Sequence, residues 1–311
     1  MRNKDTIISF LESYKLGNAT VEPITSGISS FTSLVSHDAK KYILKIYNKD
    51  SNIETEVRFS HYLYSNKIPV AKIIQNSKSQ LITDINDLRG VLFEFCFGEP
   101  VKWGDINTFF SEHLAETLAK MHSLMIGNTE IPGKDYCKSN IDSVSGVSNI
   151  KIIEKSKEIS DSIKNLDFSC LKKGLIHADI TRQNVLATKD RNDINAIIDF
   201  GDAHYDYFVW DLAVLITHIF ITKTYGIDWK ALGDFIKKYY ELIPLTEKEV
   251  GAIIPFIKIR NLNLAIEVNR LSLKKEGNSD ELISIEDSVM TKLDLVEKEQ
   301  ERLEKLLKGN G

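Results

Sequence analysis

The sequence predicts an α+β fold with two lobes: a small antiparallel β lobe that carries one packed helix, and a large, mainly helical lobe. In the first part of the chain, short segments alternate apolar and polar side chains between turn residues, which is typical of strands. Beyond Gly98, apolar residues recur every three or four positions over long segments, which is typical of helices. A five-residue hinge at 92–96 separates the two patterns. We therefore expect the small lobe at 1–97 and the helical lobe at 98–311.

The small lobe opens with a helix and continues as strands. The strand from 40 to 48 alternates most clearly, and the segment at 52–67 reads as a helix that ends before Pro69. The last strand stops at Gly98, where the chain can turn. In chain order, the predicted strands of this lobe lie at 21–27, 31–38, 40–48, 79–86 and 89–97.

The helical lobe begins with an amphipathic helix at 106–125, in which Leu118 and Met125 belong to one apolar face. A second helix is predicted at 147–166. Two short strands and a loop follow, then a strongly apolar helix at 209–220 and three further helices. A chain of 311 residues is long enough for both lobes.

Composition and charge exclude several functions. The net charge of −4 argues against a nucleic-acid-binding protein, whose surface is normally basic. The three cysteines are widely spaced, which indicates neither a disulfide framework nor a zinc site. The most apolar run, about 13 residues long, contains Asp211 and His218 and is too short to span a membrane. We expect a cytoplasmic protein, a monomer or homodimer, without nucleic-acid or membrane partners.

Lys45 lies on an apolar strand face, together with Ile43 and Tyr47. A lysine on such a face requires a counter-ion or an anionic ligand. In the next helix, the apolar spacing places Glu56 on the side that faces the sheet. A Lys45–Glu56 pair would satisfy both charges and aim the ammonium at a phosphate. The alternative is a lysine on an edge strand that reaches water.

The segment "LIHADITRQNVLATKDRNDINAIIDFGDA" sets Asp179, Asn184 and Asp199 beside apolar neighbours. Two carboxylates and one amide oxygen form a hard donor set that suits Mg²⁺. Phosphoryl transfer needs mainly positioning and neutralised charge. The spacing predicts Asn184 and Asp199 as metal ligands and Asp179 as the group that orients the attacking hydroxyl. Alternatively, Asp and Asn are common turn formers.

The pattern "LIHADITRQNVL…IIDFGDA…YDYFVWDLA" resembles the Brenner motif region of the aminoglycoside phosphotransferase and choline kinase superfamily, which has the protein-kinase-like fold. The resemblance covers nearly the whole chain. It implies ATP as the phosphoryl donor, with GTP left open, and Mg²⁺ as the metal. It also implies residue roles: Asp179 as the catalytic-loop aspartate, Asn184 and Asp199 on Mg²⁺, Lys45 on the α- and β-phosphates, the backbone of Glu94, Phe95 and Cys96 on the purine base, and Asp211 and His177 as structural supports of the loop.

Within the superfamily, "IDFGDAHYDYFVWDLAVLI" and the later segment around Arg260 are most similar to the hydroxylysine kinase and type II homoserine kinase branch. This resemblance implies that a small amino acid or amino alcohol accepts the phosphate on its hydroxyl. Asp202 and Arg260 are the candidate substrate contacts. Arg260 could bind a substrate carboxylate, because a guanidinium matches a carboxylate with two hydrogen bonds. Alternatively, Arg260 forms a surface ion pair.

Two positions depart from the family pattern. Ala178 stands where a glycine usually precedes the catalytic aspartate. The loop "SGISSFTS" has the single glycine Gly27, so it is not a glycine-rich kinase loop. The hydroxyls of Ser29 and Ser30 and the backbone amides of this loop are nevertheless candidates for covering phosphates. A plain hairpin turn is the alternative.

Other functions share the same residues. An aminoglycoside or other antibiotic O-phosphotransferase would need several acids around the acceptor pocket. A peptide-modifying kinase and a non-catalytic pseudokinase scaffold are further alternatives. Protein-kinase activity is disfavoured, because no Ala-Pro-Glu element follows the Asp-Phe-Gly motif. The acids available for a polycationic acceptor are Glu267, Glu276, Asp280, Glu281 and Asp287, which on amphipathic helices more often form a solvated face.

Overall fold

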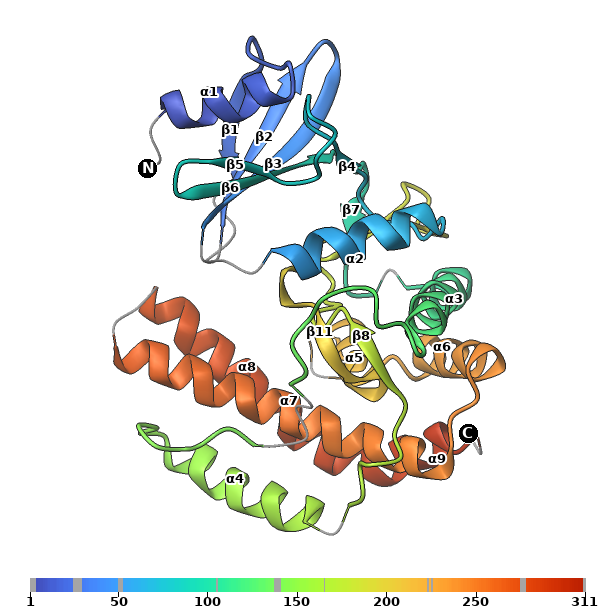
Figure 1. Cartoon of the computed structure of the whole chain (residues 1–311). Coiled ribbons are helices and arrows are strands. Elements are labelled where there is room, and N and C mark those ends of the chain that lie inside the picture. The colour runs from blue at the N-terminus through green and yellow to red at the C-terminus, as the bar shows by residue number, and fades with distance from the viewer. Residues whose placement is uncertain are drawn as a thin grey trace.

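The predicted α+β class is confirmed by the computed structural model (Figure 1), in which a small β-rich lobe lies above a larger lobe of long helices. None of the helices in the described residues has both the length and the apolar character needed to span a membrane. The structure describes residues 4–24, 30–49, 53–104, 106–136, 141–164, 166–222, 224, 226–274 and 278–309.

Within the described residues, the small lobe is built on a six-stranded sheet whose strand pairs are all antiparallel. β3 lies between β2 and β6, so Lys45 is not on an edge strand and the edge-strand alternative is excluded. The strand order is β1-β2-β3-β6-β4, with β5 also paired to β6. The strands are β1 (Thr20–Ile24), β2 (Phe31–His37), β3 (Lys40–Asn48), β4 (Ile73–Ile74), β5 (Thr83–Ile85) and β6 (Leu88–Glu94).

The two faces of this sheet carry different helices. On one face, Phe10 of α1 (Lys4–Ser13) packs with Leu44 and Ile46 of β3. The opposite face carries α2 (Glu54–Ser65), where Val57 packs with Tyr47. The alternation of β3 accounts for this, because successive side chains point to opposite faces. The lobe therefore has α1 as well as the predicted helix packed on its sheet.

The hinge begins later than the sequence indicated. Leu92 and Phe93, predicted as hinge residues, are buried and pair with β3 and β4 as part of β6. Their hydrogen bonds hold them in the sheet, so the connection to the helical lobe starts at Phe95. The next strand is β7 (Glu99–Pro100), which pairs with β9 (Val185–Ala187) of the helical lobe. The division at 97/98 stays a prediction.

The helical lobe is built around α7, which begins with a capping box formed by Thr246 and Glu249. α7 contacts α4, α5, α8 and α9. The sequence predicted three helices after the apolar helix, whereas the described residues form four. The additional helix arises because the chain breaks at Glu299, between α8 and α9. The helices are α3 (Thr108–Met125), α4 (Ile150–Ile163), α5 (Phe208–Leu215), the π-helical turn η2 (Ile216–Phe220), α6 (Trp229–Leu242), α7 (Glu247–Leu273), α8 (Ser279–Lys298) and α9 (Gln300–Leu307).

Two short antiparallel strand pairs carry the polar motif. β8 (Lys173–Ile176) pairs with β11 (His204–Tyr207), and β9 pairs with β10 (Ile194–Ile197). The loop 177–184 connects β8 to β9, and the turn η1 (Phe200–Asp202) lies between β10 and β11. These strand ends hold the polar residues near one another.

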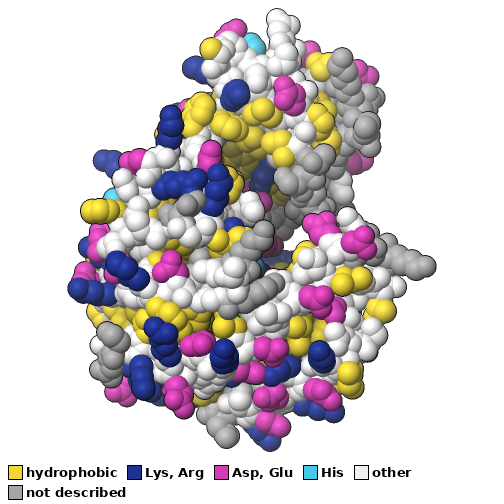
Figure 2. Space-filling model, turned by 180° about the vertical axis from the view of Figure 1, so that it is seen from behind, with side chains coloured by type: hydrophobic (Ala, Val, Ile, Leu, Met, Phe, Trp, Pro, Cys, Tyr) yellow, Lys and Arg dark blue, Asp and Glu magenta, His cyan; other side chains and the backbone are white. Residues whose placement is uncertain are grey.

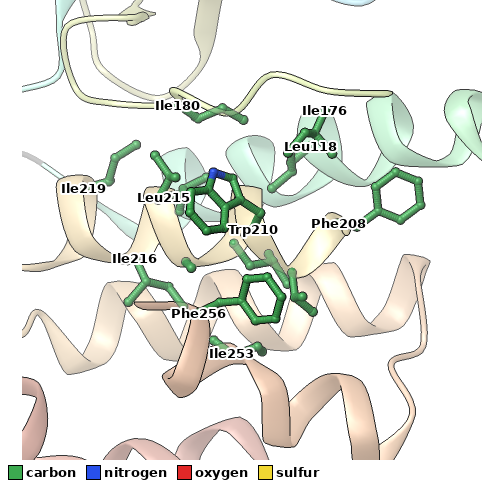
Figure 3. Packing of buried hydrophobic residues seen from close by; sticks show 14 of the residues in the cluster. Leu118, Ile176, Ile180, Phe208, Trp210, Leu215, Ile216, Ile219, Ile253 and Phe256 are labelled. Atoms are coloured by element: carbon green, nitrogen blue, oxygen red, sulfur yellow. The ribbon is translucent and has the colours of Figure 1, made fainter. Parts of the chain in front are cut away.

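An apolar core supports this loop from below (Figure 3). Ile176 ends β8 just before the loop and Ile180 lies within the loop, and Trp210 of α5 lies between them and Phe256 of α7. The rings of Trp210 and Phe256 meet edge to face, with 5.9 Å between their centroids. Close packing of this kind restricts the movement of the residues that it supports.

Candidate active site

Asp179 and Asn184 lie on the same loop and are joined directly. The Asn184 Nδ2 atom donates to the Asp179 Oδ2 atom at 2.9 Å and to the Asp179 carbonyl at 2.9 Å. Because the amide nitrogen makes these bonds, the Oδ1 atom of Asn184 is directed away from Asp179 and remains an acceptor. Burial raises the pKa of Asp179, while His177 and Arg260 oppose the shift.

Asn184 and Asp199 lie at the same end of the β9–β10 hairpin. Val185 pairs with Ile197, and the Ile198 amide donates to the Asn184 carbonyl at 2.9 Å. Asn184 therefore precedes one strand at the point where Asp199 follows its partner strand. This placement brings an amide oxygen and a carboxylate to one edge.

The donor chemistry at this edge fits a magnesium ion. Asn184 and Asp199 provide only oxygen ligands, as Mg²⁺ prefers. Among the described residues, no group of three or more His, Cys, Asp or Glu side chains could hold a metal. A metal here would take these two side chains and complete its shell with water and phosphate oxygens, as Mg²⁺ usually does.

Lys45 pairs with one carboxylate from each lobe. Its Nζ atom lies 2.9 Å from Glu56 Oε1 and 2.8 Å from Asp199 Oδ1. Burial disfavours the ammonium, but Glu56 and Asp199 outweigh burial and raise the pKa of Lys45. Burial likewise opposes the charge of Asp199, yet Lys45 lowers the pKa of that carboxyl. The predicted Lys45–Glu56 pair is thus present, and Lys45 is held as a cation beside Asp199.

Tyr47 is a site residue that the sequence analysis did not single out. Its hydroxyl donates to Glu56 Oε2 at 2.8 Å, so both oxygens of this buried carboxylate are hydrogen-bonded. Burial and the charge of Glu56 raise the pKa of Tyr47 well above its ordinary value. The signal was available, because Tyr47 follows Lys45 by two residues on the same strand face.

We expect Tyr47→Phe to lower the free energy of unfolding by about 1.5–3 kcal/mol, because a buried carboxylate loses one hydrogen bond. Chemical denaturation measures this value. Tyr64→Phe is the matched control, since Tyr64 lies on α2 and is 41% exposed. Equal stability of the two variants would show that the Tyr47 hydroxyl does not support Glu56.

Asp211 holds the first part of the loop 177–184. Its Oδ2 and Oδ1 atoms accept from the amides of His177 at 3.0 Å and Ala178 at 2.7 Å. The carboxylate is fully buried and also lies 3.2 Å from the Nε2 atom of His122. Burial opposes its charge, but the hydrogen bond and charge of His122 lower the pKa of Asp211.

His122 and Tyr239 extend this support and were not predicted. The Nδ1 atom of His122 lies 2.7 Å from the Tyr239 hydroxyl, which links α3 to α6. His122 follows Leu118 by four residues, so the helical spacing already placed it on the buried face. A histidine on that face was the signal that the sequence analysis missed.

The His177 side chain fixes the same loop from the other side. Its Nδ1 atom accepts from the Asp179 amide at 3.2 Å. Its Nε2 atom therefore carries the proton and donates to the Ile198 carbonyl at 3.1 Å. His177 thus joins the loop 177–184 to the segment that carries Asp199.

Ala178 has a backbone conformation that favours glycine, with φ of 67°. The left-handed conformation costs an L-residue about 1–2 kcal/mol, which glycine avoids. The alanine that stands in place of the usual glycine of the motif therefore strains the loop.

We expect Ala178→Gly to raise the free energy of unfolding by about 1 kcal/mol, after the entropy cost of glycine is subtracted. Ala203→Gly is the control, because Ala203 has a φ of −60° and gains nothing from glycine. Thermal or chemical denaturation of both variants checks this. A loss of stability in Ala178→Gly as large as in Ala203→Gly would contradict the strain.

The candidate substrate contacts lie beside Asp179. The Nη2 atom of Arg260 is 3.8 Å from Asp179 Oδ1, and its side chain is 17% exposed. Arg260 is therefore turned into the site, unlike the surface ion pair considered as the alternative. Asp202 is exposed, and its charge helps to raise the pKa of Asp179.

Of the acids considered for a polycationic acceptor, Glu267 lies near the site, where its charge acts on the pKa of Arg260. Glu276 lies outside the described residues. The other four side chains are exposed, as expected for a solvated helix face: Glu267, Asp280, Glu281 and Asp287.

The residues predicted to hold the base are partly committed to other bonds. The Glu94 amide donates to the Lys72 carbonyl at 2.8 Å, and the Phe95 amide donates to the Lys41 carbonyl at 3.1 Å. Their amides are therefore bonded within the protein, so that any contact of the Glu94 and Phe95 backbone with a purine would be made by their carbonyls. In the part of the chain that the structure describes, the Cys96 amide has no protein acceptor. The Cys96 amide thus stays the candidate hinge donor for a base.

The loop predicted to cover phosphates is described only in part. Ser29 lies outside the described residues. The Ser30 hydroxyl lies 3.2 Å from that of Thr32 at the start of β2.

Comparison with known proteins places this site in a family. Residues 20–231 match the model of the phosphotransferase enzyme family. A homoserine kinase of Methylobacillus flagellatus is 24% identical over 256 residues, which cover 78% of this chain and 77% of that protein. A hydroxylysine kinase of Xenopus laevis is 20% identical over 282 residues, covering 79% and 74%.

A solved structure shares the fold. The microcompartment-associated aminopropanol kinase superposes with a TM-score of 0.73 and 16% identity, covering 97% of this chain and 99% of that chain. This likeness confirms the protein-kinase-like architecture that the sequence predicted. The chain belongs to the phosphotransferase enzyme family and is a phosphotransferase that acts on a hydroxyl group.

Proposed function

We propose that the protein is an ATP- and Mg²⁺-dependent kinase that transfers the γ-phosphoryl group to the hydroxyl of a small amino acid or amino alcohol. The observation that carries this proposal is the convergence of Lys45, Asp199 and the Asp179–Asn184 pair at the junction of the lobes. The similarity to a homoserine kinase and a hydroxylysine kinase, and the fold shared with an aminopropanol kinase, support the acceptor class.

Each residue has a defined part in this reaction. Asp179 accepts the proton of the acceptor hydroxyl as the hydroxyl oxygen bonds to the γ-phosphorus and the bond to the ADP oxygen breaks. Its raised pKa makes the carboxylate a better proton acceptor. Arg260 at 3.8 Å limits that rise and keeps the carboxylate beside the acceptor.

Lys45 would bind the α- and β-phosphates, with Glu56 and Tyr47 holding its ammonium in place. Asn184 and Asp199 would hold Mg²⁺, which neutralises charge on the triphosphate when bound. The Cys96 amide and the Glu94 carbonyl would bond the base at the hinge. Ser30, with Ser29 of the preceding segment, would cover the phosphates.

Purified protein with ATP, Mg²⁺ and a panel of hydroxylated amino acids and amino alcohols tests this function. We expect ADP to accumulate together with a phosphorylated acceptor, identified by its mass. An acceptor found only among aminoglycosides would favour the antibiotic alternative. ATP that binds without turnover on any acceptor would favour a pseudokinase scaffold.

A further inference from the structure

Four basic side chains from separate segments share one region of the helical lobe, and one of them, Arg260, lies 3.8 Å from Asp179. They are Arg182 of the catalytic loop, His218 of η2, Arg260 of α7 and Lys292 of α8. The positive charges of Arg182 and Arg260 act on both His218 and Lys292, which shows that the four groups share one region. Like charges do not cluster away from water without an anion to balance them.

Arg182 is held in a fixed orientation. Its guanidinium stacks on the Trp103 ring at 3.3 Å from the centroid, and its Nη1 atom donates to the Val101 carbonyl at 3.3 Å. Trp103 is itself fixed, because its Nε1 atom donates to the Ile221 carbonyl at 3.0 Å at the end of η2. The guanidinium plane is therefore preorganised and keeps further N–H donors for a ligand.

Lys292 is the least expected member of the cluster. Its residue is only 9% exposed, and no carboxylate of the described residues lies within ion-pair distance of its ammonium. Burial, followed by the charges of Arg182 and Arg260, lowers the pKa of Lys292 to about 8. A buried lysine without an acid destabilises the free protein, which indicates that it is retained for binding.

His218 contributes a buried donor or acceptor to the same region. Its Nε2 atom is buried and has no hydrogen-bond partner among the described residues. Burial and the three neighbouring cations lower its pKa well below the ordinary value, so the ring is neutral. A neutral imidazole can still donate one N–H bond to an anion.

The acids that face this cluster are few. The charges of Asp179, Asp202 and Glu267 oppose the lowering of the Arg260 pKa by burial, whereas burial and the charges of Arg182 and Arg260 all lower the pKa of Lys292. The cluster therefore has an excess of positive charge at the side of the site where the acceptor binds. A planar carboxylate matches this set, because guanidinium groups bond both of its oxygens in their plane.

We propose that Arg182, His218, Arg260 and Lys292 bind the carboxylate of the acceptor, so that the kinase phosphorylates a hydroxylated amino acid in preference to the corresponding amino alcohol. This inference rests on the proposed function and narrows its acceptor class. The distance of 3.8 Å between Arg260 and Asp179 means that a bound carboxylate lies close to the group that accepts the hydroxyl proton. The carboxylate and the reacting hydroxyl of the acceptor are therefore separated by only a few bonds.

Pairs of compounds that differ only in the carboxylate test the proposal. The pairs are L-serine and ethanolamine, L-threonine and 1-aminopropan-2-ol, and L-homoserine and 3-aminopropan-1-ol. With Mg-ATP, we expect kcat/KM for the acid to exceed that for its amine by about 10²-fold, because a charge-assisted contact is lost with the carboxylate. An amine that is phosphorylated as well as its acid overturns the proposal.

The variant Lys292→Met tests whether Lys292 binds the acceptor carboxylate or only supports the fold. We expect the acid preference to fall at least about tenfold through a higher KM, while the melting temperature of the unliganded protein rises because an unpaired buried charge is removed. Lys298→Met is the control, since Lys298 lies exposed at the end of α8. A variant with a lower melting temperature and an unchanged acid preference would show that Lys292 has only a structural role.

Binding measured without turnover distinguishes this inference from the proposed function. If no compound is phosphorylated, the proposed function fails, and the pocket is then tested by the melting temperature with L-homoserine or 3-aminopropan-1-ol. Stabilisation of the wild-type protein by the acid alone, lost in Lys292→Met and kept in Lys298→Met, supports the pocket. Equal response to both compounds, or an unchanged response in Lys292→Met, overturns it.

Discussion

Asp179→Asn should lower kcat by about 10²–10⁴-fold, because the acceptor hydroxyl loses the group that takes its proton. Asparagine keeps the size of the side chain and can still contact Asn184, whose amide also donates to the Asp179 carbonyl. We therefore expect the affinity for Mg-ATP to change little. Steady-state kinetics and calorimetric titration with a non-hydrolysable ATP analogue measure the two quantities.

Asp287→Asn provides the control for this loss, because Asp287 is exposed on α8 and distant in sequence from the motif. The pH dependence gives a second check. Burial raises the pKa of Asp179, so activity should fall on acidification at a higher pH than an ordinary aspartate would give. A kcat for Asp179→Asn within tenfold of the wild-type value would show that this carboxylate is not the proton acceptor.

Asp211→Ala should lower the free energy of unfolding by about 3–5 kcal/mol, since it removes one partner from a fully buried network. The His177 and Ala178 amides and the His122 ring would lose their acceptor. Chemical denaturation measures the loss. Because the amides belong to the catalytic loop, kcat should fall as well.

Asp294→Ala is the comparison for this effect, because Asp294 is exposed on α8 and its nearest ion pair is 3.9 Å long. We expect its stability to remain near that of the wild-type protein, as for most surface changes. If Asp211→Ala were as stable as Asp294→Ala, the loop would not depend on this carboxylate.

Much of the site could be predicted because its residues follow local periodicities. Strand alternation placed Lys45 on the inner face, and helical spacing placed Glu56 opposite that face. The spacing of Asp179, Asn184 and Asp199 indicated the candidate site residues of the helical lobe. Their convergence across the lobes came from the family resemblance, since no local pattern fixes contacts between residues that lie 154 positions apart, such as Lys45 and Asp199.

Other parts had no local signal. Leu92 and Phe93 belong to β6 and not to the hinge, because an alternating pattern does not mark the point at which strand pairing stops. The cluster of basic side chains draws on a loop, η2, α7 and α8. Arg260 was a candidate contact from the sequence, whereas Arg182 and Lys292 alone are typical of ordinary surface residues. Only the packing of α8 against α7 reveals that Lys292 is buried.

The small lobe and the helical lobe are indented where they meet (Figure 2), and Lys45 and Asp199 join them at 2.8 Å. A crystal structure with Mg²⁺ and a non-hydrolysable ATP analogue tests most directly whether the triphosphate binds there. We predict that the metal is coordinated by Asn184 Oδ1 and the Asp199 carboxylate, with the Lys45 ammonium on the phosphates. A nucleotide bound elsewhere, or a metal held without either side chain, would contradict this account.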